Sequence, residues 1–138
     1  IFEPAAITIC PVVGPEALTG STRMKSGTAQ KMILNMISTT TMVKLGKTYE
    51  NLMVDVNATN EKLKARACRI VMQATECDEA TAIKALDACE NKAKVAILMV
   101  LTNTNAEQAA KSLSHHNGYL REAVKTDTAD KPTPKADN

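Results

Sequence analysis

Residues 14–31 read Gly-Pro-Glu-Ala-Leu-Thr-Gly-Ser-Thr-Arg-Met-Lys-Ser-Gly-Thr-Ala-Gln-Lys and join an apolar run to a long helix-like run. The preceding residues 5–13 are rich in β-branched side chains and carry no charge, which predicts a short buried strand. A junction of this kind leaves backbone N–H groups free at the start of the helix, where small anions tend to bind. The stretch therefore predicts one edge of a ligand site on an α/β sheet.

The predicted strand has no obvious partner in the rest of the chain, and a lone strand is not stable in water. We therefore expect residues 1–60 to form the C-terminal part of a larger α/β domain whose N-terminal half is missing here. A long helix is predicted over residues 22–45, with Ser21 or Thr22 as its N-cap and Gly46 as its C-cap. Its apolar residues cover most sides, which is typical of a helix buried in a larger body.

The remainder of the chain predicts short helices. Residues 47–60 read as a linker that packs on something, and 61–77 as a connecting helix opened by Asn57 or Thr59. A weak internal repeat follows, because Glu79–Leu86 resembles Ala106–Leu113.

We expect residues 78–125 to form a small helical bundle similar to a ubiquitin-associated domain, with turns at Asn91 and at Asn117-Gly118. Its four helices are predicted at 78–89, 91–101, 106–115 and 118–125. Residues 126–138 are polar, contain two prolines, and predict a disordered tail.

Composition limits the classes of protein to consider. The chain has 138 residues, of which 44% are hydrophobic but only 2% aromatic, so the core must be built from Ala, Ile, Leu, Val and Met. The net charge of +2 is spread along the chain, which argues against a nucleic-acid-binding face. Apolar runs are too short to span a membrane, and no signal peptide is evident. The four cysteines form no C-x-x-C pair and predict reduced thiols, so we expect a cytoplasmic protein.

The candidate site residues lie in the opening stretch. Glu16, at the end of the predicted strand, fits an acid or base near a sugar, and it fits equally a turn acid that caps the following segment. The hydroxyls of Ser21 and Thr22 and the cations Arg23 and Lys25 suit a phosphate or sugar oxygens. The alternative is plain N-capping with the cations solvated. The spacing of a P-loop is absent.

Other ionisable residues give weaker signals. His115 and His116 are adjacent, so on a helix they face different ways and do not chelate one metal; we expect both at the surface and no metal site. Asp55 and Glu61 border the predicted connecting helix, where capping and a role in an active-site lid both remain open. No Ser-His-Asp or Cys-His arrangement is evident.

Two stretches carry a family resemblance. Residues 13–31 and 51–63 resemble N-acetylmuramic acid 6-phosphate etherases, and the Gly-Ser-Thr-Arg-Met-Lys core at 20–25 is shared with glucokinase regulatory protein. The resemblance extends to about residue 124. It implies a sugar isomerase domain, a doubly wound parallel α/β sandwich that binds phosphosugars and often forms homodimers, followed by a small helical domain.

The same resemblance implies a reaction. It is the cleavage of the lactyl ether of N-acetylmuramic acid 6-phosphate to N-acetylglucosamine 6-phosphate and D-lactate in cell-wall recycling, without a metal or organic cofactor. The phosphosugar loops and catalytic glutamates of that family belong to the half that this chain lacks, so the catalytic residue is unknown and the isolated chain is expected to be inactive.

The resemblance makes Glu16 the first substrate-pocket candidate, with Ser21, Thr22, Arg23 and Lys25 after it. The alternative function is a non-catalytic phosphosugar-binding regulator. A third reading makes the residues after Asp78 an interaction module.

Overall fold

The structure is a computed structural model that describes residues 6–129. The described part is mainly helical, as expected, and has one small sheet at a place where none was predicted. It divides into two compact units between Thr41 and Met42. In chain order the elements are α1 (Lys25–Lys44), β1 (Thr48–Tyr49), β2 (Leu52–Met53), α2 (Glu61–Thr75), α3 (Glu79–Ala88), α4 (Ala93–Thr102), α5 (Ala106–His115) and α6 (Leu120–Ala129).

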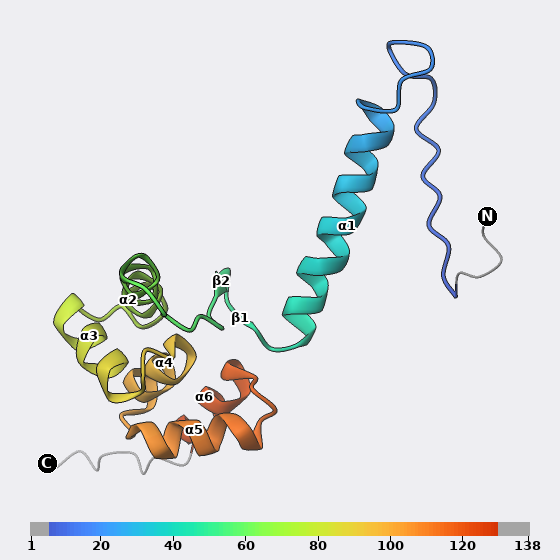
Figure 1. Cartoon of the computed structure of the whole chain (residues 1–138). Helices are drawn as coiled ribbons and strands as arrows, with labels where there is room; N and C mark the ends of the chain where they lie inside the picture. Colours follow the sequence, from blue (N-terminus) through green and yellow to red (C-terminus); the bar gives the residue numbers. More distant parts are fainter. Residues whose placement is uncertain (1–5, 130–138) are drawn as a thin grey trace, which may run out of the picture. The chain divides into compact units, whose positions relative to one another are not determined.

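The first unit begins with an extended segment that runs back along α1 (Figure 1). The strand predicted over residues 5–13 is not formed in its described part, 6–13, so this prediction is wrong for the structure. The reason is the missing ladder: no described strand lies beside the segment to pair with its backbone groups. Its apolar side chains are consequently exposed, with Ile7 at 82% and Val12 at 95%.

The helix α1 begins at Lys25, three residues later than predicted, because the preceding residues form a turn. In that turn the Leu18 carbonyl accepts a hydrogen bond from the Ser21 amide at 3.1 Å, and Gly20 takes a φ of 84°. None of the residues of α1 is buried, although Met32, Leu34 and Ile37 are apolar. The burial that the sequence predicts for this helix is therefore not seen within the described residues.

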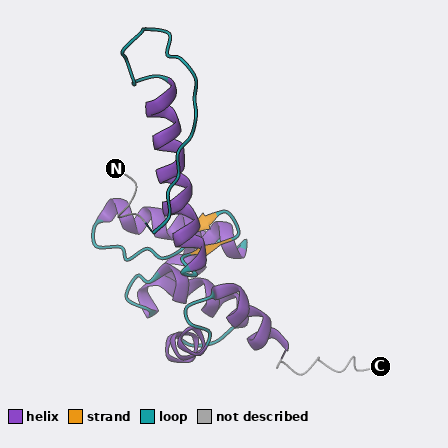
Figure 2. Ribbon diagram, turned by 90° about the vertical axis from the view of Figure 1, so that its right-hand side faces the viewer, coloured by secondary structure: helices purple, strands orange, loops and turns teal. Residues whose placement is uncertain are grey.

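The second unit begins at Met42, in the last turn of α1, and continues with a β-hairpin inside the segment 47–60, which the sequence predicts as a linker. β1 and β2 are antiparallel, with Tyr49 opposite Leu52, and Glu50 and Asn51 form the two-residue turn (Figure 2). Glu50 has a φ of 52°, in the left-handed region that such turns use. The Val54 amide donates to the Lys47 carbonyl at 3.1 Å and closes the base of the hairpin.

The helix α2 begins after Asn60, whose side chain accepts a hydrogen bond from the Leu63 amide at 2.9 Å. The predicted caps Asn57 and Thr59 are therefore wrong by a few residues. One face of α2 is apolar and faces the core, since Ala67 and Val71 are fully buried. α2 packs into the same compact unit as α3–α6, so the structure groups it with the bundle.

The internal repeat is reproduced by two helix pairs, α3–α4 and α5–α6. Asp78 and Asn105 cap α3 and α5 by accepting hydrogen bonds from the backbone three residues on. Equivalent positions are buried in both halves: Ala82 with Ala109, Leu86 with Leu113, and Ala96 with Ala123. The turn residues Asn91, Asn117 and Gly118 all have positive φ, as turns at these positions require.

The last helix is longer than predicted. α6 continues to Ala129, so residues 126–129 of the predicted tail are helical, and residues 130–138 lie outside the described part. The Thr126 and Thr128 hydroxyls donate to the carbonyls of Glu122 and Val124, one turn back. These bonds satisfy the threonine hydroxyls within the helix, although bonds of this kind do not themselves favour a helix.

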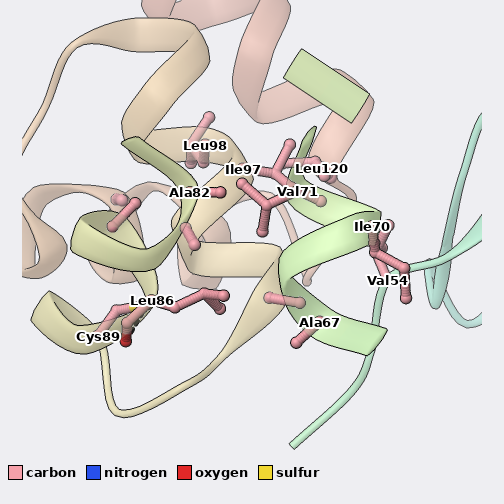
Figure 3. Close-up of a cluster of buried hydrophobic side chains, with 14 of the residues drawn as sticks. Val54, Ala67, Ile70, Val71, Ala82, Leu86, Cys89, Ile97, Leu98 and Leu120 are labelled. Atoms are coloured by element: carbon pink, nitrogen blue, oxygen red, sulfur yellow. Dashed lines mark hydrogen bonds between the residues drawn. The ribbon is translucent and has the colours of Figure 1, made fainter. Parts of the chain in front are cut away.

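The core lies between α2, α3, α4 and α6. Figure 3 shows Val71, Ile97 and Leu120 gathered in one cluster, and each is almost wholly inaccessible to solvent. Six alanines contribute fully buried positions: Ala67, Ala82, Ala93, Ala96, Ala109 and Ala123. Small side chains let the helix backbones approach closely, which fits a core without aromatic rings.

The start of α6 holds the hairpin and the end of α1 within the second unit. The Tyr119 hydroxyl donates to the carbonyl of Lys44, the last residue of α1. Arg121 pairs with Glu50 of the hairpin turn at 3.0 Å. A side chain on Gly46 would meet the Gly118 carbonyl oxygen at 3.1 Å, so this close approach requires glycine.

A charged cluster supports the same region. Lys47 bonds to Asp55 at 2.7 Å, and the Lys94 ammonium, largely buried, donates to the Gly118 carbonyl at 3.2 Å. Burial lowers the pKa of Lys94, with the nearby Asp55 opposing that effect. The hydrogen bond from Lys47 lowers the pKa of Asp55, so this carboxyl group stays charged near neutral pH.

The packing predicts how core and surface isoleucines differ. Ile97→Ala leaves a cavity at a fully buried position and should lower the free energy of unfolding by about 2–5 kcal/mol. Ile83 is 45% exposed, so Ile83→Ala should cost clearly less. Urea unfolding of the full chain, followed by circular dichroism, measures both. Equal losses for the two variants would contradict the assigned core.

Candidate functional site

The candidate site is the loop that leads into α1, and Glu16 organises it. One carboxylate oxygen of Glu16 accepts the Lys25 amide at 3.1 Å, and the other accepts the Ser26 amide at 3.1 Å. These are the first two N–H groups of α1, which have no partner within the helix. Glu16 therefore caps the helix from outside, across nine and ten residues of sequence.

The hydrogen bonds show that Glu16 caps the helix, one of the two roles that the sequence left open for this carboxylate, while its place in a substrate pocket stays a prediction. The hydrogen bonds from the Ser26 and Lys25 amides lower the pKa of Glu16. A general acid at neutral pH needs a raised pKa, whereas a carboxylate that complements a helix N-terminus is stabilised in its charged form. In this geometry Glu16 is an ionised structural cap.

Ser21 and Thr22, which the sequence predicts as N-caps, do not cap α1, because the helix begins only at Lys25. The Ser21 hydroxyl accepts the Arg23 amide at 3.4 Å, a long hydrogen bond inside the turn. Thr22 contributes its carbonyl, which accepts the Gly27 amide at 2.9 Å. The residue directly before α1 is Met24, whose side chain is no hydrogen-bond acceptor of the usual kind, and this leaves the helix start open to Glu16.

The cations of the loop face solvent. Arg23 and Lys25 are exposed, and neither forms an ion pair with an acid within residues 6–129. The structure thus brings Glu16, Ser21, Thr22, Arg23 and Lys25 into one loop, with two cationic side chains left to hold an anion and the helix N–H groups already bonded. An oxyanion bound at this loop would contact the side chains of Arg23 and Lys25, because the Lys25 and Ser26 amides are already bonded to Glu16.

The remaining candidates have local roles. Asp55 belongs to the charged cluster with Lys47, and Glu61 pairs with Lys64 at 3.0 Å in the first turn of α2. His116 lies between the Ser112 carbonyl and the Thr126 hydroxyl, at 2.9 and 3.1 Å, while His115 is exposed.

The four cysteines are free thiols. Cys68 and Cys89 are buried, and burial raises the pKa of each; Cys10 is exposed. Among the described helices, none is long and apolar enough to cross a membrane.

Comparison with known proteins gives consistent similarities. A family model described as the C-terminal lid domain of glucokinase regulatory protein matches residues 50–94. N-acetylmuramic acid 6-phosphate etherases from Pseudoalteromonas atlantica and Pectobacterium atrosepticum are 62% and 63% identical over 124 residues, which is 90% of this chain. N-acetylmuramic acid 6-phosphate etherase 2 from Vibrio cholerae is 62% identical over the same length. The resemblance noted in the sequence is therefore confirmed.

The matched region is only part of each relative. The chain spans about 40% of the length of the etherases that it matches. The similarity therefore covers the residues of this chain and leaves more than half of each relative unmatched.

The cap predicts a local response to substitution and pH. In Glu16→Gln the two amides lose a charged acceptor, so hydrogen exchange at Lys25 and Ser26 should accelerate while α2–α6 are unaffected. Because the pKa of folded Glu16 lies below its ordinary value of 4.5, protection should be complete above that pH and be lost as pH falls through the lower folded value.

Exchange mass spectrometry or NMR measures this protection, with Glu107→Gln on α5 as a control that keeps the loop intact. If hydrogen exchange at Lys25 and Ser26 were unchanged in Glu16→Gln, Glu16 would not be the cap of α1.

Proposed function

We propose that this chain is part of an N-acetylmuramic acid 6-phosphate etherase and supplies one edge of its phosphosugar pocket together with a helical unit. The observation that carries this proposal is identity above 60% across 90% of the chain to relatives of that name. The reaction would release D-lactate and N-acetylglucosamine 6-phosphate, as part of peptidoglycan recycling in the cytoplasm. The catalytic acid/base would come from residues outside this chain.

The loop geometry suggests how its residues would contribute. Arg23 and Lys25, exposed and without acidic partners in the described part, would hold the sugar phosphate, and the Ser21 and Thr22 hydroxyls would bond to sugar or phosphate oxygens. Glu16 would act indirectly. By capping α1 it fixes the turn that carries the cations.

The exposed apolar surface of the first unit supports the proposal of a larger enzyme. Ile7, Val12, Leu34 and Ile37 are more than half exposed, far more apolar surface than one segment and one helix normally leave in water. We propose that the preceding part of a sugar isomerase domain, and a second subunit of a homodimer, cover these residues. Residues 1–60 would then be the end of that domain, and 61–125 a helical appendage.

A second function is a phosphosugar-binding regulator without catalysis. The specific observation in its favour is the match of residues 50–94 to the lid domain of glucokinase regulatory protein. The two functions share the ligand class and differ in turnover, so one assay separates them.

A chimera tests the enzyme assignment. The 124 matched residues of the Pseudoalteromonas atlantica relative are replaced by the corresponding residues of this chain, and D-lactate release from N-acetylmuramic acid 6-phosphate is measured. We expect turnover near that of the unaltered relative and none from the isolated 138-residue chain. A folded chimera that binds the substrate without releasing lactate would support the regulator instead.

Within the chimera, Arg23→Ala tests the phosphate contact. Loss of one charge-assisted hydrogen bond should raise KM by about tenfold or more with little change in kcat. Lys31→Ala removes a cation from the exposed surface of α1 and serves as the matched control. Equal KM values for the two variants would show that Arg23 does not hold the phosphate.

A further inference from the structure

A polar cleft lies in the second compact unit, between the β-hairpin and α2. Its volume is ≈ 400 Å³, and its walls are Asn51, Leu52 and Met53 on one side and Arg66, Arg69 and Gln73 on the other. Ile70, a buried residue of α2, completes the lining. The cleft thus combines an apolar base with two guanidinium groups and two side-chain amides.

The two arginines are not explained by the fold. Both are exposed, and neither forms an ion pair with any acid of residues 6–129. They stand three positions apart on α2, where like charges repel and disfavour the helix. Some other cations of this unit do have partners, since Lys64 pairs with Glu61 and Lys92 with Glu90. Within residues 6–129, Lys62, Lys84 and Lys111 also form no ion pair, so what distinguishes the two arginines is their place in one cleft.

Glu50, an acidic residue close to the cleft, already forms an ion pair with another residue. Glu50, in the hairpin turn next to Asn51, pairs with Arg121 of α6 at 3.0 Å. It therefore holds the hairpin against α6 rather than neutralising the arginines. The Arg69 Nε donates to the Ala65 carbonyl at 3.4 Å, which leaves the two terminal nitrogens of its guanidinium group free for a ligand.

We propose that this cleft binds a phosphomonoester, held by the guanidinium groups of Arg66 and Arg69 with hydrogen bonds from the Asn51 and Gln73 amides. A doubly charged phosphate supplies the negative charge that the described chain does not provide, and guanidinium forks match its oxygens. The site is separate from the loop before α1 and does not depend on the enzyme assignment. It would let the helical unit respond to a phosphorylated metabolite.

The test is a titration of the full chain followed by amide NMR. Inorganic phosphate and glucose 6-phosphate should produce saturable shifts at residues 51–53 and 66–73, and these shifts should weaken at high salt. Glucose should leave these residues unshifted, and acetate should bind at least about tenfold more weakly than phosphate, since it carries one charge and not two. Comparable saturation by acetate would overturn the assignment to phosphate.

The variants are Arg66→Gln and Arg69→Gln, with Lys64→Gln as the matched loss of one positive charge elsewhere on α2. Each arginine variant should weaken phosphate binding by about tenfold, and Lys64→Gln should not. All three positions are exposed, and thermal melts confirm folding before titration.

Other outcomes refute the proposal. Shifts confined to residues 20–28 would place phosphate binding on the first unit only. Shifts at residues 51–53 and 66–73 that persist when Arg66 and Arg69 are both replaced by Gln would show that the guanidinium groups do not hold the phosphate. Saturation by a glutamate-rich peptide with no response to phosphate would assign the cleft to an acidic protein partner.

Discussion

The close approach of helix backbones through buried alanines is the constraint on which the second unit depends. Ala67 of α2, Ala96 of α4 and Ala123 of α6 are all fully buried. The chain has no tryptophan and only one phenylalanine, so large aromatic side chains cannot fill the space between the helices. The helices instead pack closely through alanine side chains, and contact between their backbones sets the interhelical distance. The hairpin, the charged cluster around Asp55 and the arginine-lined cleft are all positioned by elements packed in this way.

The helical unit was largely predictable because its signals are local. The caps Asp78 and Asn105 lie directly before their helices, and the repeat placed α3 and α5 in register. The hairpin was missed because two-residue strands are too short for an alternating pattern, and its turn has Glu50 where glycine or asparagine is usual. The strand over 5–13 failed for a different reason: apolar β-branched residues predict a strand only when something pairs with them.

The candidate site shows the limit of reasoning from spacing. Its loop was found from composition, but the role of Glu16 depends on bonds that span nine and ten residues, which no local pattern encodes. Nothing in the sequence suggests a distant cap, because Ser21 and Thr22 are themselves good N-cap residues; the start of α1 after Met24 is seen only in the structure. The cleft beside the arginines of α2 could not be predicted from the sequence, because its opposite wall is the unpredicted hairpin.

The contact between Gly46 and Gly118 has a consequence for how this sequence can vary. Both residues have positive φ, and a methyl group on Gly46 would lie 3.1 Å from the Gly118 oxygen and 3.2 Å from the Tyr119 ring. A clash is usually relieved by shrinking the opposing side chain, but Gly118 has none to give up. The Tyr119 ring is tethered through its hydroxyl to Lys44. Second-site suppressors of a substitution at Gly46 should therefore be scarce, and drift at this position should be slower than at the surrounding lysines.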